Sequence, residues 1–254
     1  MKPAEGTYQP MDEAVIRHCA EIERCNQRGA RMLSVLDLLE AHTMDLDLAA
    51  YLMARISRGA SFMVGANPGG AGKTTVMCAL LNLVPPDRPL LAATPEAVRL
   101  GSARPHCYIC HEVGAGSYFA YLWGRDLQAY CSLSDAGHML ASNLHADDIE
   151  EAYEQMCMDN RVPKAHFQGF HLMLFLRVSG VYPERRRRIA KVYSTDGKGP
   201  HKLVFDDAQS LFTPDADPVW QAECRAFLEQ SLQEGGRTIQ EFRERVVDFL
   251  QSRQ

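Results

Sequence analysis

A chain of 254 residues is long enough to bury a sizeable hydrophobic core, and its length fits one main domain with appendages. Hydrophobic residues make up 46%, charged residues 23%, and the formal net charge is -5, which disfavours both a disordered chain and a strongly basic nucleic-acid-binding protein. No stretch approaches the roughly 18 apolar residues of a membrane span, and the N-terminus lacks the apolar core of a signal peptide. We therefore expect a cytoplasmic protein, and nucleic-acid binding is not indicated.

Eight cysteines are scattered through apolar or helical surroundings, which favours reduced thiols in the core over a disulfide framework. The segment "CYICH", Cys107 to His111, also fits the pattern of covalent haem attachment, and a C-x-x-C can supply half a zinc site. Haem attachment of this kind accompanies export, and no second C-x-x-C pair is present. We therefore expect these cysteines to fill the core from a buried strand.

The first part of the chain changes from helical to strand-like spacing. The spacing of apolar residues predicts helices over residues 11–28, 32–43 and 45–59. The short apolar run at 60–66, bounded by glycine, is typical of a buried parallel strand. After a glycine-rich loop, residues 73–84 predict a helix that stops at Pro85 and Pro86.

The rest of the chain alternates between the two patterns. Strands are predicted at 89–94, 106–113, 117–124 and 138–146, and helices at 126–137 and 146–160. Three further strand-like runs, 170–180, 186–195 and 201–207, suggest an antiparallel meander at the sheet edge, followed by helices at 216–235 and 238–254. This alternation predicts an α/β fold with a mostly parallel sheet.

The stretch "GANPGGAGKTT", Gly65 to Thr75, lies between the predicted strand at 60–66 and the predicted helix at 73–84. In a phosphate-binding loop the backbone N–H groups surround a phosphate, and the following helix presents its positive N-terminal end to the same anion. Glycine is needed where a side chain would clash or φ must be positive. Gly69, Gly70 and Gly72 supply that freedom.

The residues after the glycines have the chemistry of a nucleotide site. Lys73 would place a charge near the β- and γ-phosphates, and Thr74 would offer a hydroxyl to Mg²⁺. The motif G-x-x-x-x-G-K-[ST] is broken once, because Asn67 stands at its first glycine; asparagine tolerates left-handed backbone well. We expect the nucleotide to contact Asn67, Gly69, Gly70, Ala71, Gly72, Lys73, Thr74 and Thr75.

Three segments in order resemble the motor domain of the type II and type IV secretion and pilus ATPases, over about residues 43 to 207. They are residues 46–87 around the loop, "DAGHMLASNLHADDIEEAYEQM" and "FHLMLFLRVSGVYPERRRRIAKVYSTDGKGPHKLVFD". The resemblance implies a RecA-like core that binds ATP and Mg²⁺, with His138 and His145 near the γ-phosphate. It also implies a homo-oligomeric ring and a protein partner in a secretion or pilus machine. On this basis we divide the chain into an N-terminal helical segment (1–42), a motor core (43–210) and a C-terminal helical segment (211–254).

The departures from the family pattern matter for catalysis. The acidic pair that the family carries on the strand after the loop helix is missing from "LLAATPE". Glu112 ends an apolar strand, at the edge of a parallel sheet where ligands bind, and is our best candidate for the catalytic acid and for holding a metal-bound water. Glu96 and Asp126 are weaker candidates. A surface role remains the alternative for Glu112, as does a structural role at a strand end for His145.

Phosphoryl transfer benefits from a cation at the transition state. Arg125 and the run Arg185 to Arg188 are the candidates, although a basic run in a hairpin is commonly a solvated tip. Three functions remain open: a motor ATPase, a nucleotide-gated binding module with little or no hydrolysis, and, ranked last, a small-molecule kinase. We expect loss of Lys73 to abolish nucleotide affinity without unfolding the protein, since its side chain should be partly solvated in the empty site.

Overall fold

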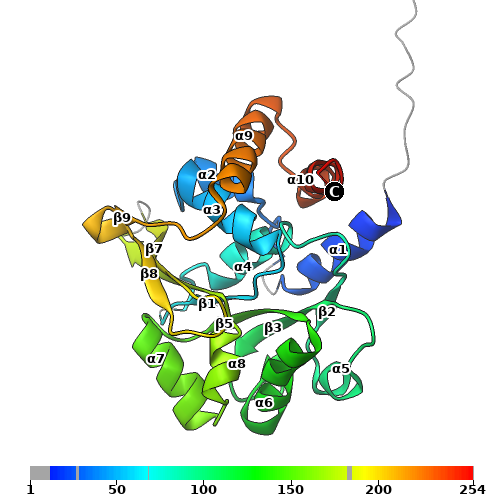
Figure 1. Ribbon diagram of the computed structural model, residues 1–254, viewed down its shortest axis with the longest axis vertical. Coiled ribbons are helices and arrows are strands. Elements are labelled where there is room, and N and C mark those ends of the chain that lie inside the picture. Colours follow the sequence, from blue (N-terminus) through cyan, green and yellow to red (C-terminus); the bar gives the residue numbers. More distant parts are fainter. Residues whose placement is uncertain (1–11, 27–28, 68, 182–184, 254) are drawn as a thin grey trace, which may run out of the picture.

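A mixed β-sheet forms the middle layer of the protein, as Figure 1 shows. The computed structural model describes residues 12–26, 29–67, 69–181 and 185–253. Within these, the strands are β1 (Phe62–Gly65), β2 (Leu90–Ala92), β3 (Cys107–Val113), β4 (Tyr121–Leu122), β5 (Met139–Leu144), β6 (Leu172–Ser179), β7 (Arg186–Ser194), β8 (Lys202–Asp206) and β9 (Leu211–Phe212).

The helices cover both faces of this sheet (Figure 1). They are α1 (Glu13–Arg24), α2 (Val35–Glu40), α3 (Leu46–Ile56), α4 (Lys73–Leu81), α5 (Pro95–Leu100), α6 (Gly124–Ser132), α7 (Ile149–Tyr153), α8 (Lys164–Gln168), α9 (Pro218–Glu234) and α10 (Ile239–Gln251). Single turns of 3₁₀ helix lie at Leu133–Ala136 and Asp207–Gln209, and a π-helical segment, Glu154–Asp159, continues α7.

The order of strands is β2-β3-β5-β1-β6-β7-β8-β9, with β4 paired to β3. The pairs from β2 to β6 are parallel, and those from β6 to β9 are antiparallel. Strand β5 lies between β1, which precedes the glycine loop, and β3. This is the RecA-like α/β core predicted from the sequence, with the antiparallel meander at its edge, and the prediction of the fold class is confirmed.

Alternation along each buried strand divides the core between the two faces. On β1, Phe62 and Val64 face α1, α2, α3, α4, α9 and α10, whereas Met63 faces the side of α5 to α8. On β5, Ala141 faces the first of these groups of helices and Leu140 faces the second. This period of two follows from the pleat of a strand buried on both faces. Apolar residues of both terminal helical segments belong to the first of these clusters.

Local differences from the predicted elements have identifiable causes. Of the strand predicted at 117–124 only Tyr121–Leu122 forms, since the segment carries a left-handed residue at Ala120 (φ 54°). Helix α5 was not predicted; its start is marked by Thr94, which caps it, and by Pro95 in the first turn. Helix α8 and strand β9 were also missed, and both have five residues or fewer.

Helix α4 is anchored at its C-terminal end by the two terminal helices. Arg243 of α10 is buried and donates hydrogen bonds to the carbonyl oxygens of Asn82 (2.8 Å) and Val84 (2.5 Å). His18 of α1 lies 3.0 Å from the carbonyl oxygen of Leu81 through Nε2. A cation here compensates the carbonyl groups that have no partner at a helix C-terminus. Desolvation lowers the pKa of Arg243 to about 10, so this anchor places a costly charge in the core.

We expect Arg243→Ala to lower the free energy of unfolding by about 2–3 kcal/mol, because two buried carbonyl groups lose their donor. Urea denaturation measures the change. The control is Arg17→Ala, which removes an exposed ion pair with Glu13 on α1 and should have little effect. Equal stability of the two variants would show that Arg243 does not anchor α4.

Candidate functional site

The chain turns sharply between β1 and α4. Gly70 (φ 80°) and Gly72 (φ 98°) adopt left-handed backbone that other residues rarely adopt, as the sequence predicts. At Gly65 a Cβ atom would lie 2.6 Å from the carbonyl oxygen of Ala146, so the loop approaches the end of β5 too closely for a side chain. Pro68 lies outside the described residues.

Helix α4 begins at this loop with its first N–H groups uncapped by a side chain. Gly72 is the N-cap residue, and it has no side chain that could accept a hydrogen bond from the first turn. Seven of the other described helices have a capping Ser, Thr or Asp side chain at this position, whereas α6 and α8 also lack one. Uncapped N–H groups and the helix dipole make such a terminus a binding site for an anion.

Three side chains from different elements meet beside this helix start. Lys73 Nζ donates to the carbonyl oxygen of Ala66 (3.1 Å) and lies 3.2 Å from His145 Nδ1 and 3.6 Å from Glu112 Oε2. Glu112 Oε2 is also 3.8 Å from His145 Nε2. The side chains of Lys73 and Glu112 are only 8% and 9% exposed, so the expectation that Lys73 is partly solvated is wrong.

Burial opposes both charges of the Lys73–Glu112 pair. Desolvation lowers the pKa of Lys73 and raises the pKa of Glu112, and in each case the attraction to the partner acts against the shift. His145 also helps to stabilise the carboxylate, yet desolvation remains the larger effect. The cluster thus holds its charges at a cost in stability, which is the usual condition of groups kept for binding or catalysis.

A β-bulge in β3 positions Glu112. Cys110 and Val113 of β3 pair with Ser142 and Leu144 of β5, so two residues of β3 lie opposite one of β5. His111 and Glu112 are those two residues, and they contact Cys25 after α1 and Lys73 of α4. The bulge interrupts the strict alternation of side chains and presents the carboxylate to the start of α4.

The cluster opens into a cavity of about 670 Å³. One wall is the loop and the first turn of α4, and Glu112, Tyr121 and His145 lie at the same end. The other wall belongs to the N-terminal segment and is largely apolar; it includes Ala30, Met32, Leu33, Leu38 and Ala41. Sequence reasoning did not identify this second wall, which lies more than 20 residues before the loop.

The β6–β7 hairpin adds basic residues to the lining of the cavity. Arg185, Arg186 and Arg187 line it, and Arg187 Nε donates to the carbonyl oxygen of Gly70 at 3.1 Å. Arg188 instead pairs with Asp207 (3.6 Å). The basic run is therefore more than a solvated tip, because one of its guanidinium groups lies against the glycine loop.

The other candidates lie elsewhere. His138 precedes β5, at the amino end of the strand whose carboxyl end leads to His145, roughly 20 Å away along the strand. Its Nδ1 accepts from the backbone N–H of His106 at 3.1 Å, and its ring packs edge-on against Tyr108. The structure therefore does not place His138 beside the phosphate loop as predicted. Glu96 of α5, and Arg125 and Asp126 of α6, do not line the cavity either.

Cys107 and Cys110 do not form a metal or haem site in the described structure. They point to opposite faces of β3, one into each core cluster, and both are fully buried. Burial raises the pKa of each thiol to about 12. All eight cysteines are free thiols, as the sequence predicts.

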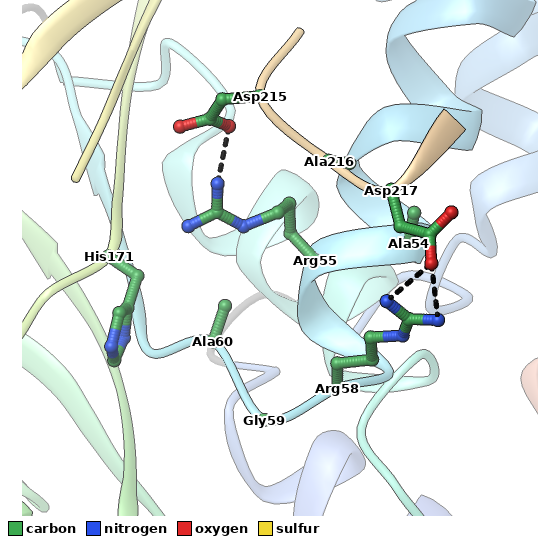
Figure 2. A pocket seen from close by; sticks show the side chains of 9 residues that line it. All are labelled: Ala54, Arg55, Arg58, Gly59, Ala60, His171, Asp215, Ala216 and Asp217. Carbon is green, nitrogen blue, oxygen red and sulfur yellow. Dashed lines mark hydrogen bonds and ion pairs between the residues drawn. The ribbon is translucent and has the colours of Figure 1, made fainter. Parts of the chain in front are cut away.

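A smaller cavity of about 280 Å³ lies at the opposite, amino edge of the sheet (Figure 2). Its cations are already neutralised: Arg55 pairs with Asp215, and Arg58 pairs with Asp217 at 3.2 Å. His171 accepts a hydrogen bond from the backbone N–H of Ser61. Paired charges leave this cavity poorly suited to an anionic ligand.

The larger cavity suits Mg²⁺ bound together with a nucleotide. Among the described residues no group of three or more His, Cys, Asp or Glu side chains forms a metal cage. Magnesium in nucleotide sites takes few protein ligands, and the rest are phosphate oxygens and water. Thr74 and Glu112 both line the cavity, and Glu112 Oε1 is a buried acceptor with no hydrogen-bond partner in the described part of the chain.

Two residues of the site escaped sequence reasoning as candidates. Asp147 and Glu151 both bind Asn67 of the loop, with the shortest contacts at 2.7 and 2.8 Å. The two acids are four residues apart and follow directly after "NLHA" in the sequence. Side chains at this spacing lie on one face of a helix, so the sequence could have indicated that the two carboxylates converge.

Comparisons with known proteins find solved structures that are similar to this chain. No protein-family model matches the chain, and no curated protein matches it in sequence. Fourteen chains of solved structures match it. One is the VirB11 ATPase from the Brucella suis type IV secretion system in complex with sulphate, at 16% identity and a TM-score of 0.45, over 78% of this chain and 61% of that one.

That protein belongs to the class of ATPases that the sequence resembles, and this chain spans about three fifths of its length. None of the helices in the described ranges is long and apolar enough to cross a membrane.

The raised pKa of Glu112 predicts a pH-dependent effect of Glu112→Gln on stability. The folded protein holds this proton more tightly than the unfolded chain, so ionisation of Glu112 lowers stability as pH rises from 4.5 through the raised pKa. Glutamine does not ionise, so the variant does not lose stability in this way. The free energy of unfolding of the variant relative to wild type should therefore increase from about pH 4 to about pH 7.

Urea titrations across this pH range measure the difference. Glu13→Gln, which changes an exposed carboxylate on α1, is the control and should give a nearly constant difference. A constant difference for Glu112→Gln as well would show that the carboxyl is not destabilised by burial.

Proposed function

We propose that this protein binds Mg-ATP and hydrolyses it, as a RecA-like ATPase of the secretion and pilus motor class. One observation carries the proposal: Lys73, Glu112 and His145 converge at an uncapped helix N-terminus inside a cavity of about 670 Å³. A cation, an acid and a second proton-carrying group beside an anion-binding helix start are the parts that phosphoryl transfer requires.

The two walls of the cavity suit the two ends of a nucleotide. The glycine loop and α4 offer N–H groups and Lys73 to the phosphates. The apolar wall from the N-terminal segment suits the face of a base, because pockets for such ligands combine apolar surfaces with a few polar groups. Phosphate oxygens would replace Glu112 as the partners of the Lys73 ammonium.

Once phosphate oxygens bind Lys73, the carboxylate of Glu112 would be free to accept a hydrogen bond from another group near the γ-phosphate. Its Oε1 already lacks a hydrogen-bond partner among the described residues, so it can orient a water molecule for attack. Thr74 and Glu112 would help to hold magnesium bound with the nucleotide, which would neutralise charge on the phosphates.

Arg187 supplies a cation from within the same chain. Its guanidinium lies against the carbonyl oxygen of Gly70 and can turn toward a γ-phosphate that arrives at the loop. A cis arginine of this kind stabilises the charge that develops in the transition state. The neighbouring Arg188 is engaged with Asp207, which makes it the less suitable candidate.

The wider assignment rests on the resemblance in sequence. We propose a cytoplasmic homo-oligomer, assembled as a ring, that transmits its nucleotide state to a protein partner of a secretion or pilus machine. Movement between subunits that depends on bound nucleotide is the common way in which such assemblies do work.

Lys73→Ala should abolish nucleotide binding while the protein stays folded. Burial disfavours the charge of Lys73, and Glu112 can take up a proton when its partner is removed, so the variant should stay folded, whereas the phosphates lose their main side-chain cation. Fluorescence titration with a labelled ATP analogue and Mg²⁺ should show at least about a hundredfold loss of affinity, and steady-state phosphate release should fall to background.

Lys198→Ala, at an exposed loop far along the chain, is the matched control and should behave as wild type. Phosphate release is measured without any added acceptor, because a small-molecule kinase would show little under that condition. Undiminished binding in Lys73→Ala would contradict the proposed site.

A nucleotide-gated module is the second candidate, favoured by the acidic pair that is missing from the strand after the loop helix. In the described residues Glu112 is the carboxylate that forms an ion pair with Lys73. If the protein is an ATPase, Glu112→Gln should keep its nucleotide affinity and lose at least about a hundredfold in turnover. The same titration and phosphate-release assays measure both quantities. Turnover equal to that of wild type would favour the module.

A further inference from the structure

Asn67 stands where a phosphate loop has its first glycine, and its side chain is bound by two acids of another segment. Its backbone N–H donates to Asp147 Oδ1 at 2.7 Å, and its Nδ2 donates to Asp147 Oδ2 (3.1 Å) and Glu151 Oε2 (2.8 Å). A glycine would keep the first of these bonds and lose the other two.

The two acids are themselves held in place. Glu151 Oε2 accepts from the backbone N–H of Asp147 (2.8 Å), and the backbone N–H of Glu151 donates to Asp148, which caps α7. Asn67 therefore ties the beginning of the phosphate loop to a preformed helix start. These groups are exposed, so the bonds contribute little to global stability.

The segment tied in this way carries His145. Its Nδ1 lies 3.3 Å from the carbonyl oxygen of Asn67 and 3.2 Å from Lys73 Nζ, and it is separated from Asp147 by one residue. Half of the His145 side chain is exposed, so packing alone does not determine its position. The contacts at Asn67 supply the restraint that packing lacks.

We propose that Asn67 is a positioning residue for the reaction proposed above: through Asp147 and Glu151 it holds His145 in place against the phosphate loop. It acts on turnover more than on binding, because the backbone N–H groups that surround the phosphates do not depend on its side chain. The expected effect on turnover rests on the proposed function, whereas the expected effect on the position of His145 does not.

The test compares Asn67→Gly and Asn67→Asp with wild type. Glycine restores the motif and removes the two side-chain bonds, whereas aspartate turns both into repulsions. Asn67→Gly should bind the labelled ATP analogue within about threefold of wild type and lower kcat at least about tenfold, with Asn67→Asp lower still. The imidazole NMR signals of His145, assigned with His145→Gln, should shift in both variants even without nucleotide.

Rescue distinguishes a direct contact from a general disturbance. Asp147→Asn offers an amide donor to the carboxylate introduced at position 67, so the double variant Asn67→Asp with Asp147→Asn should recover at least about threefold in kcat over Asn67→Asp alone. Asp148→Asn, combined with Asn67→Asp, is the matched control. Asparagine also caps helices well, and the side chain of Asp148 accepts a hydrogen bond from the backbone of Glu151 and does not bind Asn67. The control should give no rescue.

The outcomes separate the two proposals. Wild-type kcat and an unchanged His145 signal in Asn67→Gly would overturn the positioning role, and so would a loss of affinity equal to the loss of kcat. Absence of nucleotide binding by wild type would overturn the proposed function, while the His145 signal of the nucleotide-free variants would still decide whether Asn67 positions His145. Equal rescue by Asp148→Asn would also count against the contact.

Discussion

The burial of Lys73 beside Glu112 is the constraint on which the site depends. An ammonium that is 8% exposed needs acceptors, and it finds them in the carbonyl oxygen of Ala66, in Glu112 and in His145. Those groups come from the ends of β1, β3 and β5, so the order of strands in the sheet is what brings them together. Desolvation disfavours both the ammonium and the carboxylate, and each charge is partly compensated by the other.

The terminal segments complete this arrangement from outside the parallel core. Arg243 and His18 hold the C-terminal end of α4. At its N-terminal end Lys73 binds the carbonyl oxygen of Ala66 and pairs with Glu112, so the helix is restrained at both ends. The segment after α1 supplies the apolar wall, and the β6–β7 hairpin supplies Arg187. Together these segments enclose the glycine loop on sides that the parallel strands do not reach.

Asn67 shows how a departure from a motif can be accommodated by its surroundings. In place of a glycine with no side chain, the loop carries an amide whose donors match two carboxylates across the site. Hydrogen bonds to charged acceptors are stronger than those between neutral groups, and two of them converge on one side chain. The broken motif and the acids after His145 are therefore one feature of the structure rather than two.

By itself, the sequence determined the local pattern: a buried strand, a glycine loop, a helix that ends before a proline pair, and an α/β alternation with an antiparallel end. These follow from periodicity and from the conformational freedom of Gly70 and Gly72, which act over a few residues. Helix α4 ends at Leu81, three residues before the predicted end at residue 84. Only the tertiary structure decided that His145 joins Lys73 while His138, at the other end of β5, does not. It also decided that Asp147 binds Asn67 and that residues before α2 line the cavity. Such contacts join segments that are far apart in the chain; Lys73 and His145, for example, are 72 residues apart. The sheet brings these segments to one edge, and a local sequence pattern does not reveal which of them meet there.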